Sequence, residues 1–115
     1  MNQIALVTGA GRGVGQVTAI TLAKKGWTVV AAGRDKAAVD AVAKQAGGQS
    51  VGMVCDVSDQ ASVIELFKAI KDKYGRLDLL FNNAGVVAPG VALEELELKD
   101  WRNVVDVNIS GVFYC

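Results

Sequence analysis

A chain of 115 residues accommodates one domain, and a hydrophobic content of 51% with a single proline is typical of a globular protein. The 12 Lys and Arg balance the 12 Asp and Glu, so the charge pattern argues against nucleic acid or an acidic membrane surface as a partner. Two cysteines, no histidine and no metal-like spacing argue against a zinc site or a Cys/His nucleophile pair, so no metal is expected.

Two features of the sequence bear on its location. No basic-then-apolar signal segment opens the chain, since a glycine-rich loop already begins by residue 9, and no apolar run is long enough to span a bilayer. We therefore expect a cytoplasmic protein with no membrane partner. Cys55 ends an apolar run and is expected to be a buried, reduced core residue.

Strand and helix patterns alternate along the whole chain. Each strand candidate is a short, nearly continuous apolar run, as expected for parallel strands buried on both faces. In chain order, the pattern predicts a strand at Ile4–Val7, a helix from about Gly13 to Lys25, a strand at Thr28–Ala32, a helix capped by Asp35 and ended by Gly47, a strand at Ser50–Cys55, a helix from Ser58 or Asp59 to Gly75, a strand at Leu77–Phe81 and a last helix from about Lys99.

The last predicted helix continues to the end of the chain. Trp101, Val105, Asn108 and Val112 lie close to one stripe of it, which predicts the face that packs. We expect Trp101 and Phe113 to be packing residues rather than substrate contacts.

This alternation predicts an α/β fold with a parallel sheet, right-handed crossovers and helices on both faces. In a doubly wound, Rossmann-like sheet the strand order is 3-2-1-4, and ligands bind beyond the strand ends where the chain reverses direction. Residues 1–115 are therefore expected to form one dinucleotide-binding domain, incomplete at its C-terminus. The predicted site lies between the residues that follow the first strand and those that follow the fourth.

A glycine cluster, Thr8-Gly9-Ala10-Gly11-Arg12-Gly13-Val14-Gly15, directly follows the first strand. A strand, a tight turn and a helix aim backbone N–H groups and a positive helix end at one point, which suits a pyrophosphate. The G-x-G-x-x-G fingerprint does not match, because its third glycine falls on Val14, and no Lys-Ser/Thr pair follows as in a P-loop. A tight turn without a ligand is the structural alternative.

Four motifs lie in a matching order on the predicted elements: Thr8-Gly9-x-x-x-Gly13-x-Gly15, Asp56-Val57, Asn82-Asn83-Ala84-Gly85, and Asn108. On these motifs the chain resembles the short-chain dehydrogenases/reductases over essentially its whole length. The resemblance implies that Asp56 contacts adenine and that Asn108 belongs to the active site. The predicted cofactor-binding residues are Thr8, Gly9, Gly11, Arg12, Gly13, Val14, Gly15, Arg34, Asp56, Val57, Asn82, Asn83, Ala84 and Gly85.

Several of these residues also allow a purely structural role. Asp56 is either an acceptor for the adenine amino group or an N-cap of the third helix, and both roles are compatible. Asn82 and Asn83 either bridge neighbouring strand ends and line the cofactor crevice, or serve as turn residues. Asn108 is the predicted catalytic residue, which the resemblance implies holds a water in a proton relay; the alternative is a hydrogen-bonded structural amide.

The end of the second strand bears on the choice of cofactor. By resemblance, an acid that selects NAD would stand at position 33, which is Gly33. Arg34 follows at once, and Arg12 lies in the glycine loop, so two guanidinium groups are available for a 2′-phosphate. Asp35 is the competing acid, and we interpret it as a helix cap. NADP(H) is therefore favoured over NAD(H).

The resemblance also implies a serine and a Tyr-x-x-x-Lys pair, which these 115 residues do not contain. We expect the N-terminal, cofactor-binding part of an NADP(H)-dependent oxidoreductase that acts on a small carbonyl or alcohol, and a homo-oligomer when complete. A non-catalytic nucleotide-binding module is the alternative. These residues alone are expected to be inactive, because they lack the proton donor, and marginally stable, because the apolar fourth strand and last helix are left uncovered.

Overall fold

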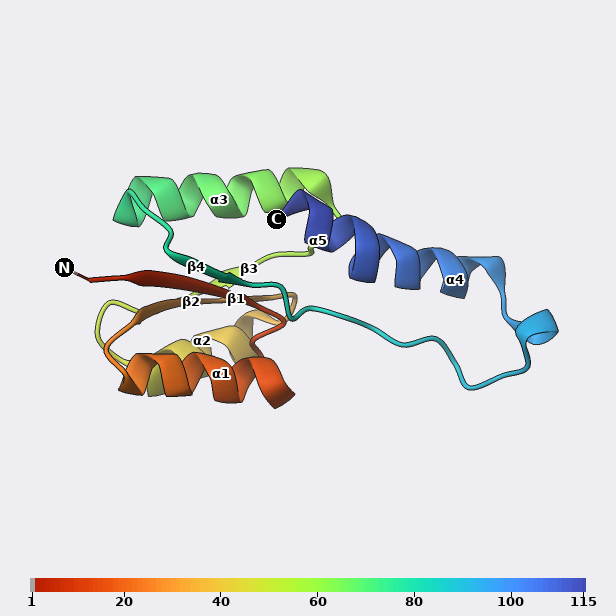
Figure 1. Ribbon diagram of the computed structural model, residues 1–115, viewed down its shortest axis with the longest axis horizontal. Helices are drawn as coiled ribbons and strands as arrows, with labels where there is room; N and C mark the ends of the chain where they lie inside the picture. The colour runs from red at the N-terminus through yellow and green to blue at the C-terminus, as the bar shows by residue number, and fades with distance from the viewer. Residues whose placement is uncertain (1) are drawn as a thin grey trace.

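The computed structural model describes residues 2–115 and contains a four-stranded parallel sheet of order β3-β2-β1-β4 (Figure 1). The strands are β1 (Ile4–Thr8), β2 (Thr28–Gly33), β3 (Val51–Val54) and β4 (Leu79–Phe81). In the centre of the sheet, Leu6 of β1 pairs with Val30 of β2 on one side and with Leu80 of β4 on the other. The predicted doubly wound, Rossmann-like order is confirmed.

Helices cover both faces of the sheet (Figure 1). Helices α1 (Gly13–Lys24) and α2 (Lys36–Ala46) lie on one face, and α3 (Gln60–Tyr74) lies on the other. Side chains alternate along the strands, so Val7 faces α1 and α2 while its neighbour Leu6 faces α3. This two-sided burial explains why the central strands are apolar at every position.

The predicted helix ends agree with the observed caps. The Asp35 side chain caps α2 by accepting a hydrogen bond from Ala38 N at 3.2 Å, and Asp59 caps α3. Gly75 ends α3 with φ of +73°, a left-handed conformation that favours glycine. Two strands are shorter than predicted: β3 lacks Ser50 and Cys55, and β4 begins at Leu79 instead of Leu77.

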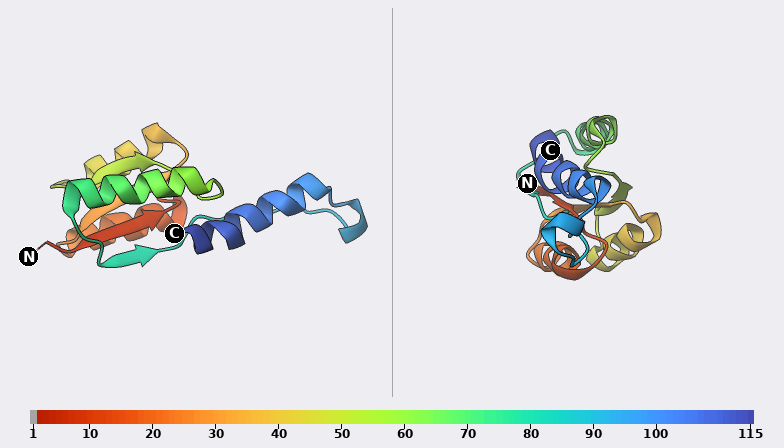
Figure 2. Two further views of the ribbon diagram at one scale, coloured as in Figure 1. Left: turned by 90° about the horizontal axis from the view of Figure 1, so that it is seen from above. Right: turned by 90° about the vertical axis from the view of Figure 1, so that its right-hand side faces the viewer.

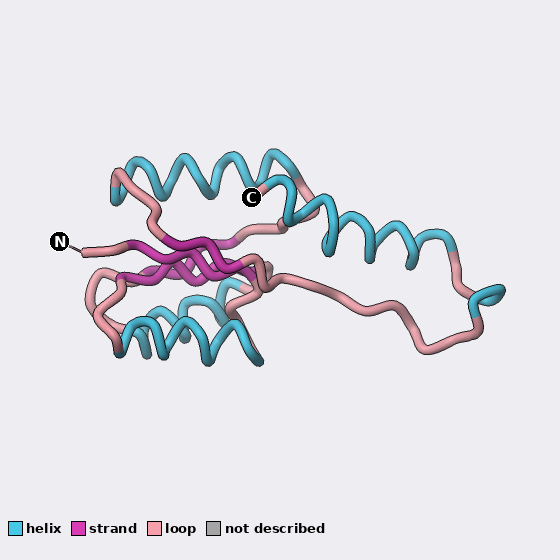
Figure 3. The backbone as a smooth tube through the Cα atoms, viewed as in Figure 1, coloured by secondary structure: helices cyan, strands magenta, loops and turns pink. Residues whose placement is uncertain are grey.

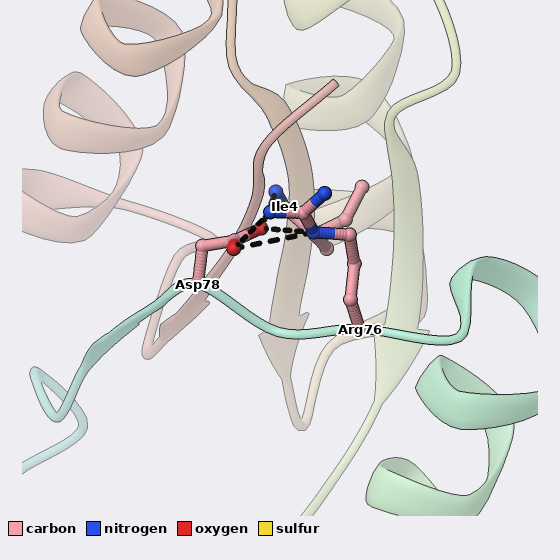
Figure 4. A network of polar contacts seen from close by, with 3 residues as sticks. All are labelled: Ile4, Arg76 and Asp78. Atoms are coloured by element: carbon pink, nitrogen blue, oxygen red, sulfur yellow. Dashed lines mark hydrogen bonds and ion pairs between the residues drawn. The ribbon is translucent and has the colours of Figure 1, made fainter. Parts of the chain in front are cut away.

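Strand β4 is attached to the start of β1 by a polar network (Figure 4). Ile4 N donates a hydrogen bond to Asp78 Oδ2 at 2.8 Å, and Asp78 N donates to Ile4 O at 2.9 Å. Arg76 donates to the same carboxylate through Nε at 2.9 Å and Nη2 at 2.6 Å. This ion pair and the bond to Ile4 N hold the pKa of Asp78 below its usual range.

A C-terminal arm projects away from the sheet (Figures 1 and 2). After β4 the chain runs through a long loop, drawn pink in Figure 3, to the short turn η1 (Leu93–Glu95). A continuous helical rod follows, made of α4 (Leu98–Val105), a π-helical segment η2 (Asp106–Ser110) and α5 (Gly111–Tyr114). The described residues therefore measure 52 × 25 × 21 Å.

The arm corrects the prediction about the last helix. Trp101 is 54% exposed and Phe113 is 83% exposed, so neither is a packing residue within the described part of the chain. The buried residues of the rod are Val107 and Gly111, because only its C-terminal half reaches the sheet and α3. A Cβ on Gly111 would overlap Val57, which shows how closely the rod approaches the loop after β3.

Candidate functional site

A cavity of about 490 Å³ lies beyond the carboxyl ends of the strands. It adjoins the ends of the neighbouring strands β1 and β4, where the connections that leave the two strands run in opposite directions, as expected for a doubly wound sheet. Most of the predicted residues line it: Gly9, Gly11, Arg12, Gly13, Val14, Arg34, Asp56, Val57, Asn83, Ala84 and Gly85. The lining does not include Thr8, Gly15, Asn82 or Asn108.

The glycine loop forms the floor of this cavity and leads into α1. Gly9 and Gly13 have φ of +61° and +58°, which the turn requires and which other residues rarely adopt. A Cβ on Gly15 would overlap both the Gly9 carbonyl oxygen and the Asn83 amide, whereas a Cβ on Gly13 would meet nothing within 4 Å. Gly15 therefore allows close packing, and Gly13 leaves the approach to the helix N-terminus open.

No side chain of the described residues caps the N-terminus of α1. Its N-cap residue is Arg12, whose side chain offers no acceptor to the N–H groups of the first turn. These N–H groups and the positive end of the helix adjoin the cavity, where Arg12 adds a cationic side chain. The residues present thus fit an anionic group such as a pyrophosphate.

Thr8 and Asn83 hold the ends of β1 and β4 together beneath the cavity. Thr8 Oγ1 accepts hydrogen bonds from Asn83 N at 3.1 Å and Ala84 N at 3.0 Å, and the Asn83 side chain donates to Thr8 O and Gly9 O, both at 3.2 Å. Asn83 thus combines the two predicted roles of bridging and lining. Asn82 is exposed and no such bridge involves its side chain.

The residues that follow β2 form one rim of the cavity and carry a positive and a negative side chain. Arg34 and Asp35 line the cavity, and Asp35 also caps α2, as the sequence predicted. A Cβ on Gly33 would lie 3.0 Å from Val39 Cγ1, so an acidic residue at position 33 would need Val39 to move. Val39 also lines the cavity, but its place in the apolar pattern of α2 indicates only core packing and does not mark it as a site residue.

The segment after β3 forms the opposite wall through Cys55, Asp56 and Val57. Asp56 does not cap α3; its Oδ1 accepts hydrogen bonds from Ser58 N at 3.0 Å and Ser58 Oγ at 2.7 Å. Cys55 is buried and not in a disulfide, as predicted. Burial raises the pKa of the Cys55 thiol, the charges of nearby acids raise it further, and a hydrogen bond with Ser62 opposes the shift.

Asn108 lies in the π-helical segment and is exposed. Its Oδ1 accepts a hydrogen bond from Val86 N and its Nδ2 donates to Val86 O, both at 2.8 Å. The amide is therefore paired with backbone, which matches the structural alternative. Val86 and Val107 also line the cavity, and neither was predicted, because nothing in their apolar context marks a site.

Comparison with known proteins decides the family. The family model described as short chain dehydrogenase matches residues 3–115. The chain belongs to the short-chain dehydrogenase family. A 3beta-hydroxysteroid dehydrogenase of Mediterraneibacter gnavus is 48% identical over 116 residues, which cover 98% of this chain and 42% of the relative. A 3-oxoacyl-[acyl-carrier-protein] reductase of Synechocystis sp. is 40% identical, over 98% of this chain and 47% of the relative.

A solved structure of the family supports the same assignment. The 3-ketoacyl-(acyl-carrier-protein) reductase from Brucella melitensis, complexed with NADH, is 37% identical and superposes with a TM-score of 0.94. The match covers 97% of this chain and 46% of that structure. The chain thus spans somewhat less than half the length of these relatives and corresponds to the cofactor-binding, N-terminal part of short-chain dehydrogenases, a family of NAD(P)(H)-dependent oxidoreductases that act on small molecules.

Two further properties of the described residues concern metal sites and membrane-spanning helices. No group of three or more His, Cys, Asp or Glu in residues 2–115 is placed to hold a metal ion. None of the helices in that range is both long enough and apolar enough to cross a membrane.

Proposed function

We propose that residues 1–115 form one dinucleotide-binding domain of an NADP(H)-dependent oxidoreductase that interconverts a small carbonyl compound and its alcohol. The observation that carries the proposal is the uncapped N-terminus of α1, which opens onto a cavity lined by Arg12 and Arg34. When bound, the nicotinamide cofactor supplies the hydride donor or acceptor.

Each wall of the cavity suits one part of such a cofactor. The first turn of α1 and the open face at Gly13 would hold the pyrophosphate. Asp56 would accept a hydrogen bond from the adenine amino group, because its Oδ2 takes none from the described residues. Asn83 and Gly85, on the β4 side, would line the nicotinamide half of the cavity. Thr8 would act from below by fixing Asn83.

The preference for NADP(H) is argued from charge. Arg34 and Arg12 line the same cavity, and guanidinium groups bind phosphate through paired hydrogen bonds. Gly33 contributes no carboxylate to repel a 2′-phosphate. Asp35 supports the second candidate, NAD(H), because its carboxylate also lines the cavity. Its engagement with Ala38 N favours the capping role.

These residues alone are proposed to bind the cofactor without turning over substrate. Of the two tyrosines, Tyr74 donates a hydrogen bond to Gln49 O at 2.5 Å and does not line the cavity, and Tyr114 lies outside the lining as well. Asn108 is proposed to influence the reaction only indirectly, by holding the backbone of the cavity residue Val86. Without a proton donor beside the cofactor, hydride transfer to a carbonyl is not completed.

The test is isothermal titration of the purified protein with NADP⁺ and with NAD⁺. We expect NADP⁺ to bind at least tenfold more tightly, because only it carries the 2′-phosphate that the two arginines would contact. Equal affinity for both dinucleotides would refute the preference, and binding of neither would refute the proposed cofactor site.

A further inference from the structure

The wall formed by residues 55–57 has a sheet neighbour on one side only. Strand β3 is at the edge of the sheet, and Cys55 N donates a hydrogen bond to Gly33 O at 2.9 Å as the last backbone contact toward β2. Beyond Cys55 the segment leaves the sheet and turns into α3. The polar contacts that hold Asp56 in place come from the turn that follows it and from the first turn of α3.

Two serine hydroxyls supply that support. Ser62, in the first turn of α3, accepts a hydrogen bond from Asp56 N at 3.0 Å through Oγ. Ser58 holds Asp56 Oδ1 through both N and Oγ. The backbone and one carboxylate oxygen are thus fixed, while Oδ2 takes no hydrogen bond from the described residues, and Asp56 lines the cavity.

We propose that Ser62 is a positioning residue that sets base recognition at this site. The inference rests on the proposed function, in which Asp56 accepts a hydrogen bond from the adenine amino group. Ser62 does not line the cavity and acts only through Asp56.

The physical reason is the precise geometry that a hydrogen bond requires. A side chain that recognises a ligand must stay within about 0.5 Å of its productive position, and the hydrogen bond at Asp56 N fixes the backbone from which this carboxylate extends. Removal of the Ser62 hydroxyl leaves the Asp56 N–H without its partner in a partly buried place, so the segment rearranges to find another acceptor. The carboxylate is then no longer positioned to contact the base, although α1 and the glycine loop keep the positions in which they would contact the phosphates.

The discriminating readout is the ratio of the affinities for 5′-AMP and 5′-IMP. The two nucleotides share ribose and phosphate, but IMP has a carbonyl oxygen where AMP has the amino group, so it offers Asp56 an acceptor instead of a donor. We expect the unaltered protein to bind 5′-AMP at least fivefold more tightly than 5′-IMP. Ser62→Ala should reduce this ratio below twofold by weakening AMP binding, and Ser62→Thr, which keeps a hydroxyl, should preserve it.

Ser50→Ala is the matched control. Ser50 Oγ accepts a hydrogen bond from Val29 N at 2.9 Å, which is the same kind of contact at the other, amino end of β3. This variant should lower the melting temperature about as much as Ser62→Ala and leave the AMP/IMP ratio unchanged.

The outcomes separate the two proposals. A Ser62→Ala protein with an unchanged ratio, or an equal loss of discrimination in Ser50→Ala, overturns the positioning role. An unaltered protein that binds neither nucleotide overturns the proposed cofactor site instead. One that binds both equally overturns base recognition by Asp56, and the role of Ser62 with it.

Discussion

Arg34 stands beside Gly33 at the rim of the cavity, and its charge is the residue-scale feature on which the cofactor preference depends. Arg34→Asp replaces the cation by a carboxylate that repels a 2′-phosphate and accepts ribose hydroxyls. We predict that this variant binds NADP⁺ more than tenfold more weakly, which is at least about 1.4 kcal/mol, with no loss of NAD⁺ affinity. Isothermal titration with both cofactors measures the change, and an equal loss for both would show that Arg34 does not read the 2′ position.

Gly15 matters because its lack of a side chain allows close packing, and not because it contacts a ligand. In Gly15→Ala the new methyl group overlaps Gly9 O and the Asn83 amide, so the loop and α1 must move apart. We expect a loss of about 2 kcal/mol in the free energy of unfolding, as is typical of overpacking. Gly13→Ala meets no neighbour and should cost about 1 kcal/mol, because of its positive φ alone.

The measurement for this pair is urea unfolding followed by circular dichroism, with Gly90→Ala as the control. Gly90 is exposed, has no neighbour within 4 Å and does not have a positive φ, so its substitution should leave stability unchanged. A Gly15→Ala protein as stable as the Gly90→Ala protein would mean that the close packing of loop and helix does not matter.

At the scale of elements, the Asp78 carboxylate joins β4 to β1 and makes a pH-dependent contribution. The pKa of Asp78 is lowered in the fold, chiefly by its hydrogen bonds with Arg76 and Ile4 N. A carboxyl whose folded pKa is depressed stabilises the fold above its usual pKa of about 3.8, and this contribution disappears as the pH falls through the folded value.

We therefore predict that Asp78→Asn lowers the urea midpoint at pH 6 and that the difference from the unaltered protein shrinks at pH 3 and below. Asp72→Asn, which removes an exposed carboxylate of α3, is the control and should change neither value. A gap between Asp78→Asn and the unaltered protein that stays constant down to the acid limit would contradict the role of the ionised carboxylate.

The elements also show which kinds of structure a sequence specifies locally. The caps Asp35 and Asp59 and the terminal Gly75 could be predicted, because each satisfies a backbone requirement within a few residues of itself. Asn108 was identified, but its partner was not, because the pairing with Val86 spans 22 residues of loop and rod. The packing of Trp101 was predicted wrongly, because periodicity defines a face without showing whether anything lies against it.

At the scale of the whole molecule, right-handed crossovers predicted helices on both faces, and the Rossmann-like doubly wound pattern predicted the strand order. The same rules placed the cavity between β1 and β4 and thus most of its lining. They could not give the direction of the arm, which depends on contacts such as that between Gly111 and Val57 rather than on local pattern.

The arm gives the whole molecule an uncovered apolar surface, with Phe113 83% and Ile109 64% exposed. Strand β4 adds an open sheet edge. We predict that the 115-residue protein self-associates at micromolar concentration and that Phe113→Asp shifts its elution in size-exclusion chromatography toward the monomer. Ile64→Asp, a change at an apolar position on α3 that is 61% exposed, should not. A monomeric unaltered protein with a cooperative melting transition would contradict this expectation.

The central claim is that the cavity between β1 and β4 binds the dinucleotide through the N-terminus of α1, and a titration with NADP⁺ followed by amide NMR tests it most directly. The account predicts saturable shifts for the N–H signals of Gly13, Val14 and Asp56, which line the cavity, while Gln49 and Tyr74, near the amino ends of the strands, stay unchanged. Shifts confined to the amino ends of the strands, or no shift at saturating cofactor, would contradict it.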